Sequence, residues 1–255
     1  MEASEVTRGE WAMMLLIVVL MALLSTIAQA FPENQRLGYP SCVSCHVSPS
    51  GGGALTAYGR SAGEELATWA REGDGQPLGG VIPVPEWLAL GGDTRYVNIN
   101  APGYHRKFLM QMDAEVALNT LPGLWVAASG GSYGEEHVAE SRRSYLLYAP
   151  SDHWSLRIGE FLPAYGIMQP DHTNVTRAGW TETWNTELYV HGELGEVLIT
   201  GITGDDYSLA QNGLTVRAAA SLAKRAQLGL SNAYIVYDGY QRAMSGVWGM
   251  WGGTR

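Results

Sequence analysis

Residues 107–119 read KFLMQMDAEVALN, and their side chains alternate between apolar and polar along the chain. The apolar set comprises Phe108, Met110, Met112, Ala114, Val116 and Leu118. The polar set comprises Lys107, Gln111, Asp113, Glu115 and Asn119, and Leu109 and Ala117 break the alternation. Successive side chains of a β-strand point to opposite faces, so this stretch predicts a strand with one apolar and one ionised face.

The same period of two recurs along the chain from about residue 86. In residues 154–159 (WSLRIG), Arg157 falls on the polar side, and in residues 184–191 (WNTELYVH), Glu187 and His191 do so. We expect about ten such strands, near residues 86–99, 105–119, 123–134, 140–149, 153–162, 182–193, 196–203, 213–221, 225–237 and 241–252.

The connections between these expected strands differ in length. The second, fourth, sixth and eighth are tight, whereas the odd-numbered ones are longer on the whole, notably residues 163–181 and 204–212. Short turns at one end and long loops at the other are typical of an outer-membrane β-barrel with a polar interior. A soluble β-sandwich is the alternative, but it would carry Lys107 and Arg157 on its second faces only where those faces meet water. We therefore predict a mainly β, antiparallel outer-membrane β-barrel.

Composition narrows the classes of function. The chain has 255 residues, with 16 Lys and Arg against 25 Asp and Glu and a net charge of −9. Nucleic-acid-binding proteins need a basic surface, so no nucleic-acid partner is expected. No apolar run after residue 30 is long enough for a membrane helix.

The N-terminus carries an export signal. Residues 12–28 are almost wholly apolar, follow Arg8, and end near Ala28-Gln29-Ala30, a small-residue cleavage pattern. We interpret residues 1–30 as a signal peptide, with an uncleaved membrane anchor as the alternative. Under either interpretation the rest of the chain is exported.

The strongest chemical signal is Cys42-Val43-Ser44-Cys45-His46, a C-x-x-C-H sequence. This spacing is the attachment site of c-type haem: two thiols add to the porphyrin vinyl groups, and the adjacent imidazole becomes the proximal iron ligand. A thioredoxin-like site would need a βαβ context, and a structural zinc site would need about four ligands. We predict one covalent haem c on Cys42 and Cys45, with His46 as the proximal iron ligand.

The sequence does not identify the sixth iron ligand. Apart from His46, residues 31–103 contain no His, Met or Lys. The iron is therefore either five-coordinate or completed from elsewhere. His172, in the long loop 163–181, is the first candidate as a distal ligand, and Asp171 beside it could orient the ring. His105 and His191, which have the parity of the polar face, rank below it, and a solvated histidine is the alternative for each.

Residues 31–84 are interpreted as the haem-binding segment with its linker. A helix is expected within residues 54–69, with Ser61 as its N-cap and Glu64 as the capping-box partner. Gly51, Gly52 and Gly53 are expected to permit close backbone approach to the haem. At this length the segment is expected to dock on residues 85–255 rather than fold alone.

Two strings resemble a known family. Residues 39–53 (YPSCVSCHVSPSGGG) and 58–60 (YGR) resemble the head of bacterial outer-membrane proteins that join a monohaem cytochrome c segment to a porin-like barrel. Residues 157–167 (RIGEFLPAYGI) are similar to a strand and loop of phosphate-selective porins. The resemblance implies an outer-membrane location in a Gram-negative cell and a role in electron transfer. The chain ends Gly253-Thr254-Arg255 rather than on an aromatic residue, so a barrel that is incomplete at this end is one interpretation of the sequence.

These observations together predict a haem protein that passes electrons at or across the outer membrane and is not an enzyme. Its haem segment would lie on the periplasmic side or in the barrel lumen. Its expected partners are membrane lipid and a periplasmic electron-transfer protein or an extracellular acceptor. Two alternatives remain from sequence. One is a diffusion porin whose haem segment is a structural plug, and the other is a haem-based sensor or peroxidase with five-coordinate iron.

Overall fold

The computed structural model describes residues 39, 41–66, 84–133, 138–141, 143–167, 182–204, 212–223, 226–237 and 239–251. All of them belong to the compact unit Glu33–Arg255. The signal peptide (residues 1–30), most of the linker and His172 lie outside the described residues.

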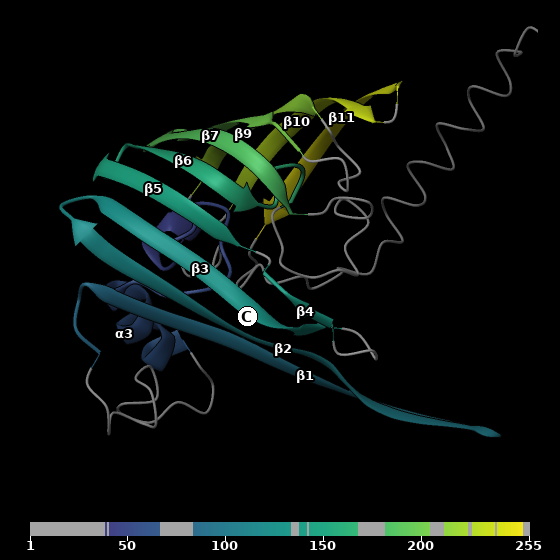
Figure 1. The fold of residues 1–255 in the computed structure, drawn as a ribbon. Coiled ribbons are helices and arrows are strands. Elements are labelled where there is room, and N and C mark those ends of the chain that lie inside the picture. Colours follow the sequence, from purple (N-terminus) through teal and green to yellow (C-terminus); the bar gives the residue numbers. More distant parts are fainter. Residues whose placement is uncertain are drawn as a thin grey trace, which may run out of the picture. The chain divides into compact units, whose positions relative to one another are not determined.

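A single antiparallel sheet makes up most of this unit, as predicted. Strands β1, β2, β3, β5, β6, β7, β8, β9, β10 and β11 follow one another across it in chain order, and the short β4 pairs with β3 (Figure 1). The strands are β1 (Leu88–Ala101), β2 (Tyr104–Leu121), β3 (Leu124–Tyr133), β4 (Val138–Glu140), β5 (Ser144–Ser151), β6 (Trp154–Phe161), β7 (Thr183–Gly192), β8 (Gly195–Ile202), β9 (Asn212–Ala223), β10 (Ala226–Tyr237) and β11 (Tyr240–Trp251). Among the described residues β1 and β11 each pair with one neighbour only, so the sheet is not closed there.

The two faces of the sheet have opposite chemistry. We call polar face the side that carries the buried residues Glu115, Arg157, Glu187, Glu196 and Arg217, and apolar face the side that carries Val116, Ile158, Leu188, Val197 and Leu230. Arg157 is 1% exposed, whereas its neighbour Ile158 is 49% exposed. Charged groups are therefore enclosed and aliphatic groups face outward, the reverse of an ordinary soluble sheet.

The predicted strand periodicity is confirmed, but one detail of it is wrong. The pairing of β1 with β2 shifts by one residue between Arg95 and Tyr96, which face Gln111 and Leu109. A bulge of one residue moves every following side chain to the other face. His105 and Lys107 therefore share a face with Leu109 and not with Asp113.

The expected alternation of connection lengths holds only in part. The connections of β3 to β5, β6 to β7 and β8 to β9 are long, as predicted. The first and ninth expected connections are instead two residues each, at 102–103 and 238–239. Gly103 and Gly239 both have φ +78°, which a tight hairpin requires and which apolar alternation does not reveal.

The expected helix is α3 (Ala57–Leu66), which begins three residues later than predicted; residues 67–69 lie outside the described residues. Its N-cap is not Ser61, which lies inside the helix, but Thr56. The Thr56 hydroxyl accepts a hydrogen bond from the Gly59 amide at 3.0 Å, which satisfies a free donor of the first turn. Within the described part of the chain, no helix has the length and apolarity needed to cross a membrane.

Candidate functional site

The two cysteines and His46 lie on one tight turn. Residues Cys42–Ser44 form a 3-10 helix (η1), capped by the Ser41 hydroxyl, which accepts from the Val43 amide at 3.4 Å. The amides of Cys45 and His46 both donate to the Cys42 carbonyl, at 3.2 and 3.0 Å. Both cysteines are free thiols. The turn thus brings two unbridged thiols and an imidazole together within five consecutive residues.

His46 is held in a short β-bridge with Leu55. Its Nδ1 atom is buried and has no hydrogen-bond partner among the described residues, although the backbone of Gly52 and Gly53 lies near the ring. Burial lowers the pKa of His46, and the Gly52 and Gly53 backbone acts in the opposite direction. A depressed pKa favours the neutral imidazole, which is the form that binds iron.

This donor set fits a c-type haem. Thioether attachment needs two thiols on one short loop, and axial ligation needs a neighbouring imidazole that no other group occupies. Cys42 and Cys45 meet the first condition as free thiols, and His46 directly after them supplies the imidazole, whose buried Nδ1 has no partner among the described residues. Among the described residues, no cluster of three or more His, Cys, Asp or Glu side chains could hold a metal ion.

The glycine triplet folds back against this turn. Gly51, Gly52 and Gly53 have φ of +77°, +73° and +67°, so all three lie in the left-handed region that favours glycine. A Cβ at Gly51 would lie 3.0 Å from the Cys42 sulfur, and one at Gly53 would overlap the Glu115 carboxylate. The backbone therefore approaches Cys42 and Glu115 closely, and the predicted approach to a haem stays a prediction.

Arg157 joins the loop after the C-x-x-C-H sequence to the sheet. Its guanidinium donates to the Ser48 hydroxyl at 2.8 Å and to the Ser50 hydroxyl at 3.2 Å. It also pairs with Glu187 at 2.6 Å, and it lies 3.7 Å from the centre of the Phe161 ring. Arg157 and Phe161 both belong to residues 157–167 (RIGEFLPAYGI). Their contact therefore helps to hold the loop that contains Ser48 and Ser50.

Glu115 of β2 provides a second contact between the sheet and the residues after His46. The Glu115 carboxylate accepts from the Ala54 amide at 3.0 Å and pairs with Arg143 at 3.2 Å. Val47 and Ala54 are both buried in the apolar cluster that also contains Ala117. The residues after His46 are therefore held by charge-assisted hydrogen bonds as well as by packing.

A third group of side chains contacts the residues on either side of Cys42. The Tyr189 hydroxyl lies 2.7 Å from the Ser41 hydroxyl and donates to Glu196 at 3.1 Å. Val43 packs against the cluster that contains Tyr189. Glu196 in turn pairs with Arg217 at 2.6 Å. Cys42 is therefore docked against the polar face of β7, β8 and β9.

Burial sets the ionisation of the thiols. It raises the pKa of Cys42 to about 11; the negative charge of Glu196 adds to this shift, and the positive charge of Arg217 opposes it. Burial also raises the pKa of Cys45. Both thiols are therefore protonated at neutral pH, Cys42 most strongly.

The candidate distal ligands have separate positions. His191 lies on the polar face of β7, with its ring 5.5 Å from that of Tyr189. His105 is exposed and on the other face because of the β2 bulge. His172 lies outside the described residues. His191 is thus the described candidate that lies beside side chains contacting the C-x-x-C-H turn.

Sequence reasoning missed Tyr189, Glu196 and Arg217 as site residues. The period of two placed Tyr189 on the polar side of its strand, and Glu196 and Arg217 stand among apolar residues in sequence. The alternation predicts which side chains lie on the polar face of the sheet. It does not predict which of them contacts the segment around Cys42, since that depends on how this segment docks on the sheet.

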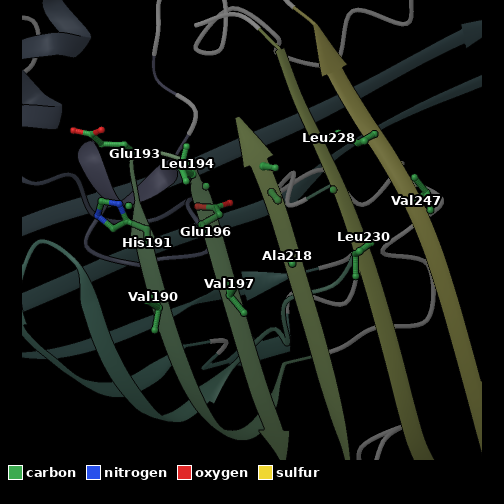
Figure 2. Close-up of a pocket in the computed structure, with 15 residues that line it drawn as sticks. Val190, His191, Glu193, Leu194, Glu196, Val197, Ala218, Leu228, Leu230 and Val247 are labelled. Carbon is green, nitrogen blue, oxygen red and sulfur yellow. The ribbon is translucent and has the colours of Figure 1, made fainter. Parts of the chain in front are cut away.

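A groove of about 750 Å³ lies over β7 to β11, and its lining includes His191 and Glu196 beside apolar residues. Figure 2 shows Val190 and Val197 leaving β7 and β8 in a different direction from His191 and Glu196. The exposed groove residues Val190, Val197, Leu228, Leu230 and Val247 belong to the apolar face.

The chain has no detectable relatives in two comparisons. No protein-family model matches it, and no curated protein sequence is significantly similar to it. The functional assignment therefore depends on the residues and their geometry.

The raised pKa values predict slow alkylation of Cys42. In haem-free protein at pH 8, iodoacetamide should modify Cys45 before Cys42, because the thiolate is the nucleophile. The Cys42 rate should rise about tenfold per pH unit until pH approaches about 11. Mass spectrometry of Cys42→Ala and Cys45→Ala variants measures each thiol separately. A Cys42 rate at pH 8 equal to that in denaturant would contradict the docked arrangement.

Proposed function

We propose that this chain is an outer-membrane haem protein that carries one haem c on Cys42 and Cys45, with His46 as proximal ligand, and passes electrons at or across that membrane. The observation that carries the proposal is the docking of the C-x-x-C-H turn on the polar face of an antiparallel sheet whose opposite face is apolar and exposed.

The exposed apolar face supports the membrane location. Large aliphatic and aromatic side chains stand outward on successive strands, among them Val116, Ile158, Leu188, Val197 and Leu230. Soluble monomers rarely expose continuous apolar patches larger than a few hundred Å². Strands with apolar groups outside and polar groups inside are the pattern that lipid requires of a spanning sheet.

The chain's own residues would position the cofactor. Arg157 and Glu115 hold the loop that follows His46, and Tyr189 contacts Ser41 directly before Cys42. The haem, when bound, supplies a one-electron ferrous/ferric couple whose potential depends on its ligands and burial. Attachment by both cysteines would keep that couple at one place relative to the sheet.

A second function, a diffusion porin with a structural plug, has one observation in its favour. Buried ion pairs and the residues around Ser48 cover part of the polar face, as a plug would. This alternative predicts that solute passage does not depend on the haem. A sensor or peroxidase requires an iron with an open sixth position instead.

The first expected result is spectroscopic. Full-length protein, expressed in a host that can attach haem c and reduced with dithionite, should show a sharp low-spin c-type absorption band. Cys42→Ala should abolish the band of doubly attached haem, because one thioether is lost. His191→Ala and His172→Ala would then test the distal ligand.

Other spectra would change the assignment. A high-spin band would favour the sensor or peroxidase, since the iron would lack a sixth ligand. If no haem is attached in a competent host, the haem proposal is wrong.

The second expected result is electron flow across a bilayer. Proteoliposomes with reduced methyl viologen inside should reduce ferric citrate outside, and a Cys42→Ala/Cys45→Ala variant should lose this activity. Efflux of a trapped neutral sugar is the companion measurement. Equal electron flow in both proteins, together with sugar efflux, would favour the diffusion porin and contradict electron transfer through haem.

The third expected result concerns the apolar face. Leu188→Arg, near the middle of β7, should destabilise assembly into lipid vesicles by about 2–4 kcal/mol, because a cation would face hydrocarbon. Leu194→Arg is the matched control, since Leu194 is 84% exposed in the turn between β7 and β8. Urea titration of folding into vesicles measures both. Equal stabilities would argue against lipid contact at Leu188.

A further inference from the structure

The side chains that flank Cys42 meet one charge pair on the sheet. Ser41 contacts the Tyr189 hydroxyl at 2.7 Å, and Val43 packs in the cluster of Ala164, Tyr189 and Leu198. Tyr189 donates to Glu196 at 3.1 Å. A continuous chain of contacts therefore runs from the residue before Cys42 to the Glu196 carboxylate.

Glu196 and Arg217 form a buried pair with few other partners. Their side chains are 4% and 3% exposed, and Arg217 Nη1 lies 2.6 Å from Glu196 Oε1. Arg217 Nε also donates to the Gly166 carbonyl at 2.9 Å, and its guanidinium lies 4.4 Å from the Trp248 ring centre. Figure 2 places Glu196 on β8, beside His191 of β7. Charges enclosed in this way are weakly screened by solvent and salt.

We propose that Glu196 and Arg217 set the reduction potential of the haem attached at Cys42, as a pair of opposed charges that nearly cancel. This inference rests on the proposed haem attachment. It assigns the two residues a role in positioning charge and not in binding the iron.

The direction of each effect follows from electrostatics. Ferric haem carries one more positive charge than ferrous haem, so a nearby carboxylate favours the ferric state and lowers the potential. A nearby guanidinium favours the ferrous state and raises it. Removing one member of the pair therefore leaves the charge of the other unbalanced, and the two removals shift the reduction potential in opposite directions.

Two other ion pairs described on the polar face contact the loop after His46 and not the neighbours of Cys42. Arg157 with Glu187 contacts Ser48 and Ser50, and Glu115 with Arg143 contacts Ala54. Among the described pairs, Glu196 with Arg217 is the one connected, through Tyr189, to Ser41 beside Cys42. The opposing influences of Glu196 and Arg217 on the Cys42 thiol agree with this placement.

The test is a spectroelectrochemical titration of full-length haem-loaded protein in detergent. Glu196→Gln should raise the midpoint potential, and Arg217→Gln should lower it. The double variant should return close to the parent value, and Arg217→Lys, which keeps the charge, should shift it least. Asp93→Asn is the control, because Asp93 pairs with Arg95 on β1 at 2.6 Å and is 38% exposed.

Each outcome decides the inference. Opposite shifts in the two single variants support it. Unchanged potentials, or shifts in the same direction, overturn it, since loosening of the site alone would move both potentials alike. If Arg217→Gln does not fold, the near-isosteric Glu196→Gln decides by its sign, and Tyr189→Phe, which removes no charge, should move the potential less. Absence of attached haem would refute the proposed function itself, whereas attached haem with an insensitive potential would refute only this inference.

Discussion

The buried guanidinium of Arg157 is the interaction on which the arrangement of this site depends. It pairs with Glu187, stacks over Phe161 and donates to Ser48 and Ser50 at once. A buried cation is tolerated only when its charge is paired and its donors are satisfied. The Nη1 and Nη2 atoms of Arg157 have partners from both the sheet and the loop, whereas its buried Nε has none among the described residues. Through the Nη contacts the polar face and the C-x-x-C-H segment stabilise each other.

The same constraint explains why the sheet is reversed relative to a soluble protein. Charged residues on β6 to β9 are enclosed because they pair with one another and with the N-terminal segment, and the aliphatic residues between them are left facing outward. Such an outer face is stable next to hydrocarbon and unfavourable next to water. The outward apolar face and the docked C-x-x-C-H segment are thus two consequences of one alternating pattern.

Much of the sheet was predictable because a period of two is a local property. The strand positions agree with the predicted ones to within a few residues, and the polar positions of Arg157 and Glu187 follow from their neighbours. The bulge at β2 was not predictable, because apolar residues run on through residues 108–110 without marking the extra residue. The cap at Thr56 was missed for a similar reason, since Ser61 and Glu64 offer an equally good local pattern.

The sequence by itself determined which donor groups lie together at residues 42–46, and it determined the class of the fold. A C-x-x-C-H sequence brings two thiols and an imidazole together on any tight turn, and alternation assigns each side chain to a face. Only the tertiary structure decided which charges meet that turn. The contacts of Ser41 with Tyr189 and of Ser48 with Arg157 join residues more than a hundred positions apart. Such pairings depend on strand register and loop docking, which no local pattern encodes.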